Sequence, residues 1–480
     1  MLTNAFGGLQ GIVDHVLVGN LVGYQANAAI GVSWQIFLVV IAFISSLFTG
    51  MSVLVARFAG AGEADKVDRV VYQAFLTAIG ISLGILAPVG YVVAPWLLNL
   101  VNAAPAVQAE ALPYLRIMFG FSSGMMIFFM LSGALRAAGD ARTPMILGIA
   151  MTVLNLLLNI VLIRGLGPIS AFGTRGSAMG TCITAGLLAC YAIWKLWRGG
   201  WVVSFPRGRG LGPIPAFGTR GSAMGTCITA GLLAVYALSR LWSGRWVVRF
   251  PRGRGWGPDW TIIRELFRFG LPTGIQGIAM NIGGVLMLSF IGSLAQSAAA
   301  QAAFAVSYTE LFALITWTSV GLMGSAAAVA GQNLGAGHPD RAEQAVHIAA
   351  RYGLAVAAFV GLFFLFFPRQ LLAIFGMHDA VVVDVGIQLL RVLSVSGLFI
   401  TVALSYTGGL QGTGDTKSPL YISMISQILV PLGICFVIQQ TGKLDPIDIW
   451  LAILAGHVTR CVLSVLRFRQ GKWRTIAVRL

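Results

Sequence analysis

Apolar runs of about twenty residues recur along the whole chain, separated by short clusters of glycine, proline and charged residues. A helix needs roughly 20 apolar residues to cross the hydrocarbon core of a bilayer, because each residue rises by only ~1.5 Å. The runs therefore predict thirteen membrane-spanning helices. They cover residues 1–22, 31–56, 70–100, 112–134, 143–164, 176–197, 221–242, 266–292, 302–330, 345–375, 383–408, 418–440 and 447–467.

One of the thirteen spans arises from a tandem duplication. A stretch of 45 residues occupies 166–210 and is repeated over 211–255, with 37 positions identical. Each copy contains one predicted span, so the duplication affects which side of the membrane the rest of the chain faces. We expect one copy to cross the membrane in the usual place. The other copy would lie at the membrane interface or pack irregularly, unless the duplication is a defect of the gene.

An older repeat relates the two halves of the chain. ARFAGAGEADKV (56–67) matches GQNLGAGHPDRA (331–342), and GALRAAGDARTP (133–144) matches GGLQGTGDTKSP (408–419). Both pairs are offset by 275 residues, so two loop motifs keep one register. Internal repeats of this kind are typical of secondary transporters.

The repeat predicts an all-α polytopic membrane protein with two homologous six-helix lobes around a central cavity. The N-terminal lobe would cover residues 1–210 and the C-terminal lobe residues 256–480. Residues 211–255 would add an extra copy of the sixth-helix segment. Twelve helices form the expected fold once this copy is set aside.

Charge along the chain predicts its orientation. The four motif loops carry Lys or Arg, whereas the alternate loops 102–112 and 292–301 carry neither. Cytoplasmic loops of membrane proteins are enriched in Lys and Arg, so we expect the motif loops and the C-terminal tail in the cytoplasm. The basic residues assigned to this tail are Arg460, Arg467, Arg469, Lys472, Arg474 and Arg479.

Composition agrees with this class of protein. Of 480 residues, 57% are hydrophobic and only 10% are charged, whereas soluble domains carry about 25% charged residues. The net charge of +16 is explained by loops that orient helices, so we expect no nucleic-acid partner. The expected partners are membrane lipids and small organic molecules, and we expect the chain to act as a monomer.

Motifs for catalysis and cofactor binding are missing from the sequence. It contains no G-x-x-x-x-G-K-[ST] phosphate loop and no H-E-x-x-H metal motif, so ATP is not expected to supply energy within this chain. We expect no enzymatic activity, no cofactor and no metal site.

Ionisable residues deep in an apolar run are candidates for ion or substrate sites. A charge at the bilayer centre costs about 2.5–3.5 kcal/mol on insertion scales, so such residues usually face a cavity or a partner. Asp14 lies in such a run and is a candidate proton or cation site, although a position near a helix end would also explain it. Asn155 and Asn159 share one helical face, where they could line a cavity or join helices.

Further candidates for the cavity wall carry polar side chains in other spans. Glu310 lies inside an apolar run, and its equivalent at the 275-residue offset is Gln35. Gln276, Tyr308 and Tyr406 are the remaining candidates. Each of these three is more often explained by ordinary packing.

The motif loops resemble those of the multidrug and toxic compound extrusion (MATE) family, bacterial branch. The resemblance is carried by GQNLGAGHPDRA (331–342), FAGAGEADK (58–66), ALRAAGD (134–140) and LQGTGD (410–415). LPTGIQ (271–276) is similar to the start of the family's seventh helix. The resemblance covers nearly the whole chain and keeps the motif order.

This resemblance implies twelve helices in two lobes related by an axis along the membrane normal. It also implies export of organic, often cationic, compounds in exchange for protons or sodium. Asp14 matches the family's first-helix aspartate, while Asn155 and Asn159 match a fifth-helix pair, which implies a cation-coupling site. Some members place carboxylates in helices seven and ten, but those positions align here with Met280 and Ile400.

Two features depart from the family pattern. The first helix lacks about three turns of its usual start, and the duplicated sixth-helix segment is foreign to the family. We nevertheless predict an antiporter of the cytoplasmic (inner) membrane. The alternatives are a flippase for lipid-linked oligosaccharides of the same superfamily, which would need a more cationic cavity, and a membrane scaffold that transports nothing.

Overall fold

The computed structural model describes residues 46–100, 122–146, 148–149, 257–375, 377 and 379–476, together with six residues between 108 and 119. The ranges 1–45 and 150–256 lie outside this description, and they include both copies of the tandem repeat. All further structural statements concern the described residues.

Seven helices in the described part are long and apolar enough to span a membrane. They comprise Ala64–Asn99, Trp260–Gly292, Ala299–Gly335, Pro339–Phe366, Ala380–Gly412, Lys417–Thr441 and Pro446–Arg469. Each overlaps a span predicted from the apolar pattern. The chain is therefore a helical, multi-pass membrane protein, as expected.

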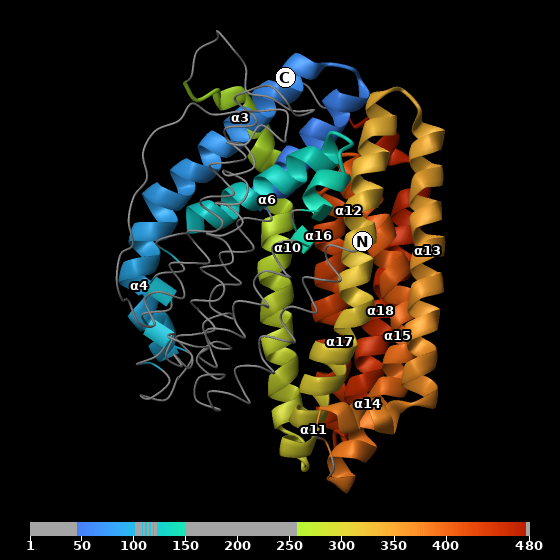
Figure 1. Ribbon diagram of the computed structural model, residues 1–480. Coiled ribbons are helices and arrows are strands. Elements are labelled where there is room, and N and C mark those ends of the chain that lie inside the picture. Colours follow the sequence, from blue (N-terminus) through green and yellow to red (C-terminus); the bar gives the residue numbers. More distant parts are fainter. Residues whose placement is uncertain are drawn as a thin grey trace, which may run out of the picture.

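The first lobe is described mainly through the following helical segments. The helix Ser46–Gly60 is followed by α3 (Ala64–Ile81), the π-helical turn η1 (Ser82–Leu86) and α4 (Ala87–Leu100). Further along the chain, α6 (Ser122–Ala137) crosses near the same end as the start of α3 (Figure 1).

The second lobe contains the remaining helices. Its elements are α10 (Trp260–Gly292), α11 (Ser297–Phe304), η2 (Ala305–Leu311), α12 (Ala313–Gly335), α13 (Pro339–Phe366), α14 (Pro368–Ile374), α15 (Ala380–Gly412), α16 (Lys417–Met424), η3 (Ile425–Leu429), α17 (Val430–Thr441), α18 (Pro446–Arg469) and η4 (Lys472–Thr475). Figure 1 shows α10, α12, α13, α15, α17 and α18 running side by side as a bundle. The core of this bundle lies around α15, where Leu389, Leu390 and Leu393 are fully buried.

One predicted span is divided in the structure. The apolar run over 345–375 forms two helices, because α13 ends at Phe366 and α14 begins at Pro368. Proline has no backbone N–H and disfavours the helical conformation in the residue before it. Phe367 accordingly leaves the helical conformation, with φ −125° and ψ 35°.

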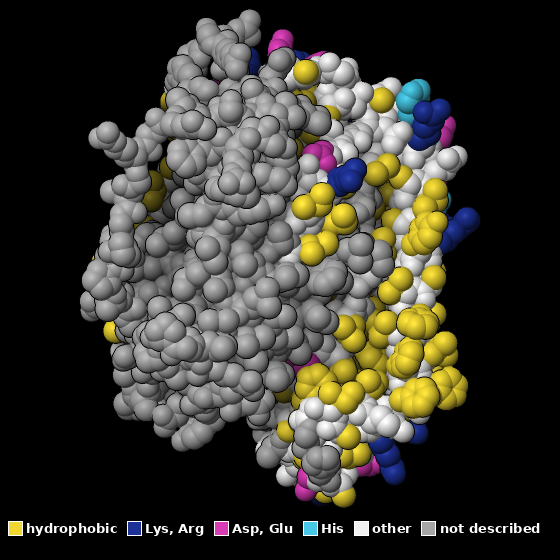
Figure 2. All heavy atoms as spheres, in the orientation of Figure 1, with side chains coloured by type: hydrophobic (Ala, Val, Ile, Leu, Met, Phe, Trp, Pro, Cys, Tyr) yellow, Lys and Arg dark blue, Asp and Glu magenta, His cyan; other side chains and the backbone are white. Residues whose placement is uncertain are grey.

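The outer face of α13 carries large exposed hydrophobic side chains. Phe359, Phe363, Phe366 and Phe367 are all exposed. In Figure 2, hydrophobic side chains cover much of this side of the molecule, while basic and acidic side chains gather toward its two ends. An apolar band bounded by charge is the surface expected of a protein in contact with lipid.

The motif loops share one backbone conformation at equivalent positions. Gly62 and Gly337 have φ values of 75° and 79°, and Gly139 and Gly414 have φ values of 102° and 96°. Both pairs are separated by the 275-residue offset found in the sequence. A positive φ favours glycine because it has no Cβ, so the repeat preserves the residue that each turn requires.

Backbone hydrogen bonds repeat in the same register. The N–H of Asp140 donates to the carbonyl of Leu135 at 2.8 Å, and the N–H of Asp415 donates to that of Leu410 at 2.9 Å. These bonds close the ends of α6 and α15, so the two lobes end equivalent helices in the same way.

The two lobes approach each other at the end that carries the motif loops. The first-lobe core includes the start of α10, where Ile262, Leu266 and Phe269 are buried. From this end, α3 and α4 run away from α10 (Figure 1). We call this region, around Gly62, Gly139, Gly337 and Gly414, the motif-loop end.

Candidate functional site

Four of the candidate residues lie outside the described part of the chain. These are Asp14, Gln35, Asn155 and Asn159. The hypothesis that Asp14 and the two asparagines form a coupling site therefore stays a prediction. The other four candidates, Gln276, Tyr308, Glu310 and Tyr406, are described.

Gln276 joins helices within the second lobe. Its side-chain amide donates to the hydroxyl of Ser423 in α16 at 2.7 Å, and it accepts a longer contact of 3.4 Å from the amide of Gln411 in α15. Gln276 and Gln411 are each only 6% exposed. Buried amides in a membrane protein join helices by hydrogen bonds of this kind.

Tyr308 and Glu310 lie in the π-helical turn η2. The ring of Tyr308 stacks on Phe304 with centroids 4.7 Å apart and contacts Phe312 at 5.5 Å. Beside it lies a pocket of about 310 Å³, lined by Tyr308, Thr309, Ala313, Thr316, Trp317 and Val320. π-helical turns occur frequently at functional sites, so this open pocket is a candidate ligand site.

Tyr406 lies in a packed aromatic cluster. It is 7% exposed, and its ring meets Phe468 edge-on at 5.3 Å and His347 at 5.8 Å. Phe468 in turn stacks on Trp473 at 4.8 Å. The cluster anchors the segment after α18 against the end of the second lobe.

The second-lobe positions at which the resemblance implies carboxylates in some members are apolar and partly or fully covered. Ile400 is buried in α15, and Met280 is half-buried in α10. Within the described part of the chain, no three His, Cys, Asp or Glu side chains lie close enough together to hold a metal ion.

Glycines allow close backbone contact between the lobes at the motif-loop end. A Cβ added to Gly60 would overlap the carbonyl of Gln332, and a Cβ added to Gly335 would overlap the carbonyl of Arg57. Gly60 and Gly335 are equivalent at the 275-residue offset, as are Arg57 and Gln332. The two contacts are therefore symmetric copies of each other.

The side chains of Arg57 and Gln332 extend this symmetric contact. The amide of Gln332 donates to the carbonyl of Ala137, in the second motif loop of the first lobe, at 2.7 Å. The guanidinium of Arg57 reaches the carbonyl of Thr413, in the corresponding loop of the second lobe, at 3.4 Å, and it also donates to Ile476. Each lobe thus contributes one side chain to the loop of the other.

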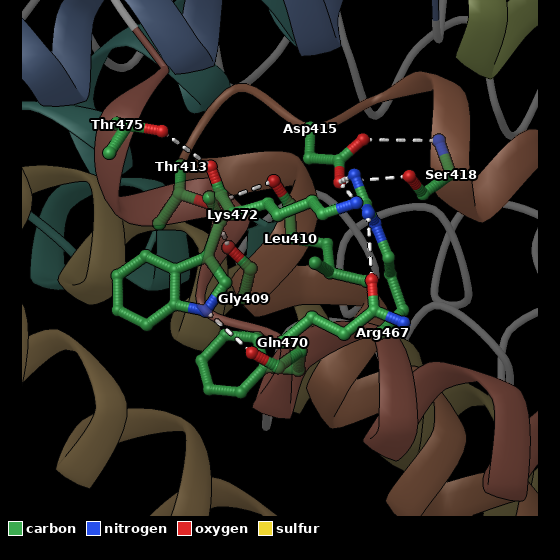
Figure 3. Close-up of polar contacts among 11 residues, drawn as sticks. Gly409, Leu410, Thr413, Asp415, Ser418, Arg467, Gln470, Lys472 and Thr475 are labelled. Atoms are coloured by element: carbon green, nitrogen blue, oxygen red, sulfur yellow. Dashed lines mark hydrogen bonds and ion pairs between the residues drawn. The ribbon is translucent and has the colours of Figure 1, made fainter.

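Asp415 organises the second motif loop (Figure 3). Its carboxylate accepts hydrogen bonds from Arg467 at 2.7 Å and from the hydroxyl and backbone N–H of Ser418 at 2.8 and 3.2 Å. The ion pair joins the end of α18 to the loop after α15. The repeated loop motif, which keeps a Gly-Asp pair in both halves, identified this loop. The ion pair, however, requires a residue 52 positions away.

The assignment of Arg460 to the basic tail is wrong. Arg460 lies within α18 and is only 3% exposed. Its Nε has no hydrogen-bond partner among the described residues. Arg460 lies well inside the predicted span over 447–467. Its position in that span was the sequence signal that it belongs to a helix and not to the tail.

These features give the described part of the molecule a defined arrangement. The lobes are in contact at the motif-loop end, while α3 and α4 diverge from α10 toward the other end (Figure 1). The contact combines backbone approaches and hydrogen bonds with the ion pair between Arg69 and Asp259. An apolar cluster shared by the first lobe and the start of α10 adds to it.

The family model MatE matches residues 1–161 and 272–437, which is more than half of the chain. The unmatched range 162–271 contains both copies of the tandem repeat.

Curated relatives match across almost the full chain. A protein of Thermotoga maritima, described as the probable multidrug resistance protein NorM, is 26% identical over 477 residues, which cover 98% of this chain and 90% of the relative. The multidrug resistance protein MdtK of Pectobacterium atrosepticum is 22% identical, with 96% of this chain and 90% of the relative covered.

Solved structures share the fold. An outward-facing multidrug resistance MATE family transporter of the MOP superfamily superposes with a TM-score of 0.81 at 19% identity, and 99% of this chain and 95% of that one are covered. A MOP superfamily transporter from Pyrococcus furiosus gives 0.80 at 18% identity over 99% and 95% of the two chains. The motif loops, the helical lobes and the family match lead to one conclusion: this chain belongs to the MatE family of multidrug and toxic compound extrusion transporters.

Proposed function

We propose that this protein is a secondary-active antiporter of the cytoplasmic membrane that exports organic, mainly cationic compounds in exchange for protons or sodium. Its motif loops and C-terminal tail would face the cytoplasm, since they are basic. The names of the relatives, which refer to multidrug resistance, support export of foreign compounds.

The symmetric contact between the lobes is the observation that carries this proposal. Gly60 and Gly335 bring the lobes together at one end through equivalent contacts. Alternating access needs two lobes that rock about a central site and close one end at a time. A closed motif-loop end corresponds to a cavity that opens to the outside.

Asp14, with Asn155 and Asn159, is the proposed coupling site. Neutralising a carboxylate at membrane depth by a proton or a cation changes which packing of its helix is favoured. The apolar positions Met280 and Ile400 in the second lobe favour a coupling site in the first lobe.

Dye transport into vesicles tests the proposal. A fluorescent organic cation would be added outside inside-out membrane vesicles that contain the full chain, and its uptake would be followed while a proton gradient or a sodium gradient is imposed separately. We expect one gradient to drive transport. Asp14→Asn should abolish transport without changing the amount of protein in the membrane.

Asp384→Asn is the matched control, because Asp384 is an exposed carboxylate that accepts a hydrogen bond of 3.2 Å from the side-chain amide of Gln388. This variant should transport normally. Full efflux by the Asp14→Asn variant would refute the coupling site. Absence of gradient-driven transport for every organic compound, with movement of a lipid-linked sugar instead, would replace the antiporter by the flippase alternative.

A further inference from the structure

One face of α18 carries polar side chains buried inside the second lobe. Trp450, His457, Arg460 and Ser464 lie seven, three and four residues apart, which places them along one side of the helix. All four are at most 3% exposed. Trp450 Nε1, His457 Nδ1, Arg460 Nε and Ser464 Oγ have no hydrogen-bond partner among the described residues.

A row of aromatic rings faces this side of α18. Phe304 stacks on Trp450 with centroids 6.0 Å apart, and Phe312 stacks on His457 at 5.8 Å. Tyr308 lies between Phe304 and Phe312 in the same row. The guanidinium of Arg460 is close enough to Tyr308 for the two groups to interact electrostatically.

Serine hydroxyls adjoin the cluster from the two π-helical turns. Ser307 precedes Tyr308 in η2, and Ser426 in η3 packs against α18 at Gly456, where a Cβ would press on the Ser426 carbonyl. Both hydroxyls are fully buried and have no hydrogen-bond partner in the described part of the chain. The two turns therefore contribute buried hydroxyls without a partner among the described residues.

The cluster presents hydrogen-bond donors and one positive charge. Guanidinium and indole groups only donate, and the hydroxyl and imidazole groups can donate as well. Arg460 forms no ion pair with a carboxylate of any described residue. A buried guanidinium is stable only when it is paired or hydrogen-bonded, because burial removes its hydration.

We propose that Arg460, with His457 and Tyr308, binds a monovalent anionic group inside the second lobe. The group is either chloride from solution or the carboxylate of an exported organic compound. Arginine suits both, because its planar guanidinium matches carboxylate oxygens and carries a permanent charge.

The pocket beside η2 provides a place for a larger anion. Tyr308 belongs both to this pocket of about 310 Å³ and to the aromatic row that faces α18. An aromatic carboxylate could place its ring among these side chains and its charge toward Arg460. The second lobe would then hold an anionic group, while the carboxylate proposed for coupling lies in the first lobe.

Thermal unfolding of the purified full chain in detergent tests this inference. Sodium chloride is compared at equal ionic strength with sodium gluconate, a larger and more strongly hydrated anion. Sodium benzoate is compared with neutral benzamide at equal concentration. If the site binds chloride, the unfolding midpoint should be higher in chloride than in gluconate. If it binds an organic carboxylate, the midpoint should be higher in benzoate than in benzamide.

Arg460→Gln should lose the increment, whereas Arg391→Gln, which alters an exposed arginine of α15, should retain it. If Arg460→Gln does not fold, Tyr308→Phe provides the second variant, and it should require a several-fold higher anion concentration for the same increment. Equal midpoints in all four solutions, or an unchanged increment in a folded variant of Arg460, would overturn the proposal.

Diffraction from crystals grown in bromide gives a measurement that needs no variant. If the site binds an inorganic anion, we expect an anomalous peak from bromide between α18 and η2. If an organic carboxylate binds at the same site, benzoate should displace this peak. Peaks confined to the protein surface, together with no effect of benzoate on stability, would contradict both forms of the inference. Because neither measurement uses transport, the anion site can fail while the proposed antiporter function stands.

Discussion

Gly335 packs so closely against the backbone carbonyl of Arg57 that no Cβ could fit between them. The same relationship holds between Gly60 and Gln332, at the equivalent positions of the repeat. The duplication of the ancestral lobe has therefore preserved the small residue on one side of the contact and the facing backbone carbonyl on the other. The facing side chains have diverged to Arg and Gln, yet both still reach into the opposite lobe.

Substituting Gly335 by alanine should weaken the contact between the lobes. The added Cβ must push the carbonyl of Arg57 away, and overpacking of this kind typically costs about 1–3 kcal/mol. We expect a lower unfolding midpoint and reduced efflux. Gly324→Ala in the same helix is the control, because nothing lies near its Cβ. It should be neutral or slightly stabilising, and equal behaviour of the two variants would argue against a tight contact.

Asp415→Asn should destabilise the second motif loop. The amide can still accept a hydrogen bond from Ser418, but the ion pair with Arg467 is lost. Arg467 is partly exposed, so solvent screening limits the expected loss to about 1–2 kcal/mol in the free energy of unfolding.

Asp379→Asn is the matched control for this measurement. Asp379 caps α15 by accepting from Val381 and Val382, and asparagine caps helices about as well as aspartate. Its unfolding free energy should change by less than about 0.5 kcal/mol. A comparable loss in both variants would mean that the ion pair contributes little.

Trp317→Ala should weaken the binding of organic cations, if the pocket beside η2 takes part in transport. Trp317 lines this pocket and is 46% exposed. A cation over an aromatic face gains about 0.5–2 kcal/mol, which corresponds to an increase of about 2–30-fold in the half-saturating concentration when the ring is removed. Trp260→Ala, at the exposed start of α10, should leave this concentration unchanged.

Removal of residues 211–255 should leave a chain that inserts and transports. The motif loops of both lobes meet at one end, so the number of crossings between them must be even. The number of predicted spans between these loops is even only when one copy of the tandem repeat does not cross the membrane. Reporter fusions after Gly255 and at the C-terminal tail check this reasoning, and we expect a cytoplasmic tail. A tail on the outside would refute it.

The sequence by itself determined the local features of the described part. Apolar runs located the long helices because crossing a bilayer requires a fixed length of apolar chain. The repeated motifs located the loops that contain Gly62, Gly139, Gly337 and Gly414. The structure shows a positive φ at each of them, which glycine adopts without strain. Pro368 is also a local signal, because proline divides the span there. The apolar pattern alone did not predict this division, since the apolar run continues through it.

Only the tertiary structure decided which residues face each other. The contact of Gly335 with Arg57, the ion pair of Asp415 with Arg467 and the aromatic row beside Arg460 all join segments that are distant in sequence. A charge count treated Arg460 as part of a basic tail, whereas helix packing buries it inside the second lobe. Hydrophobic length and turn chemistry are properties of short segments, but burial and pairing depend on the packing of helices against one another, which no single segment specifies.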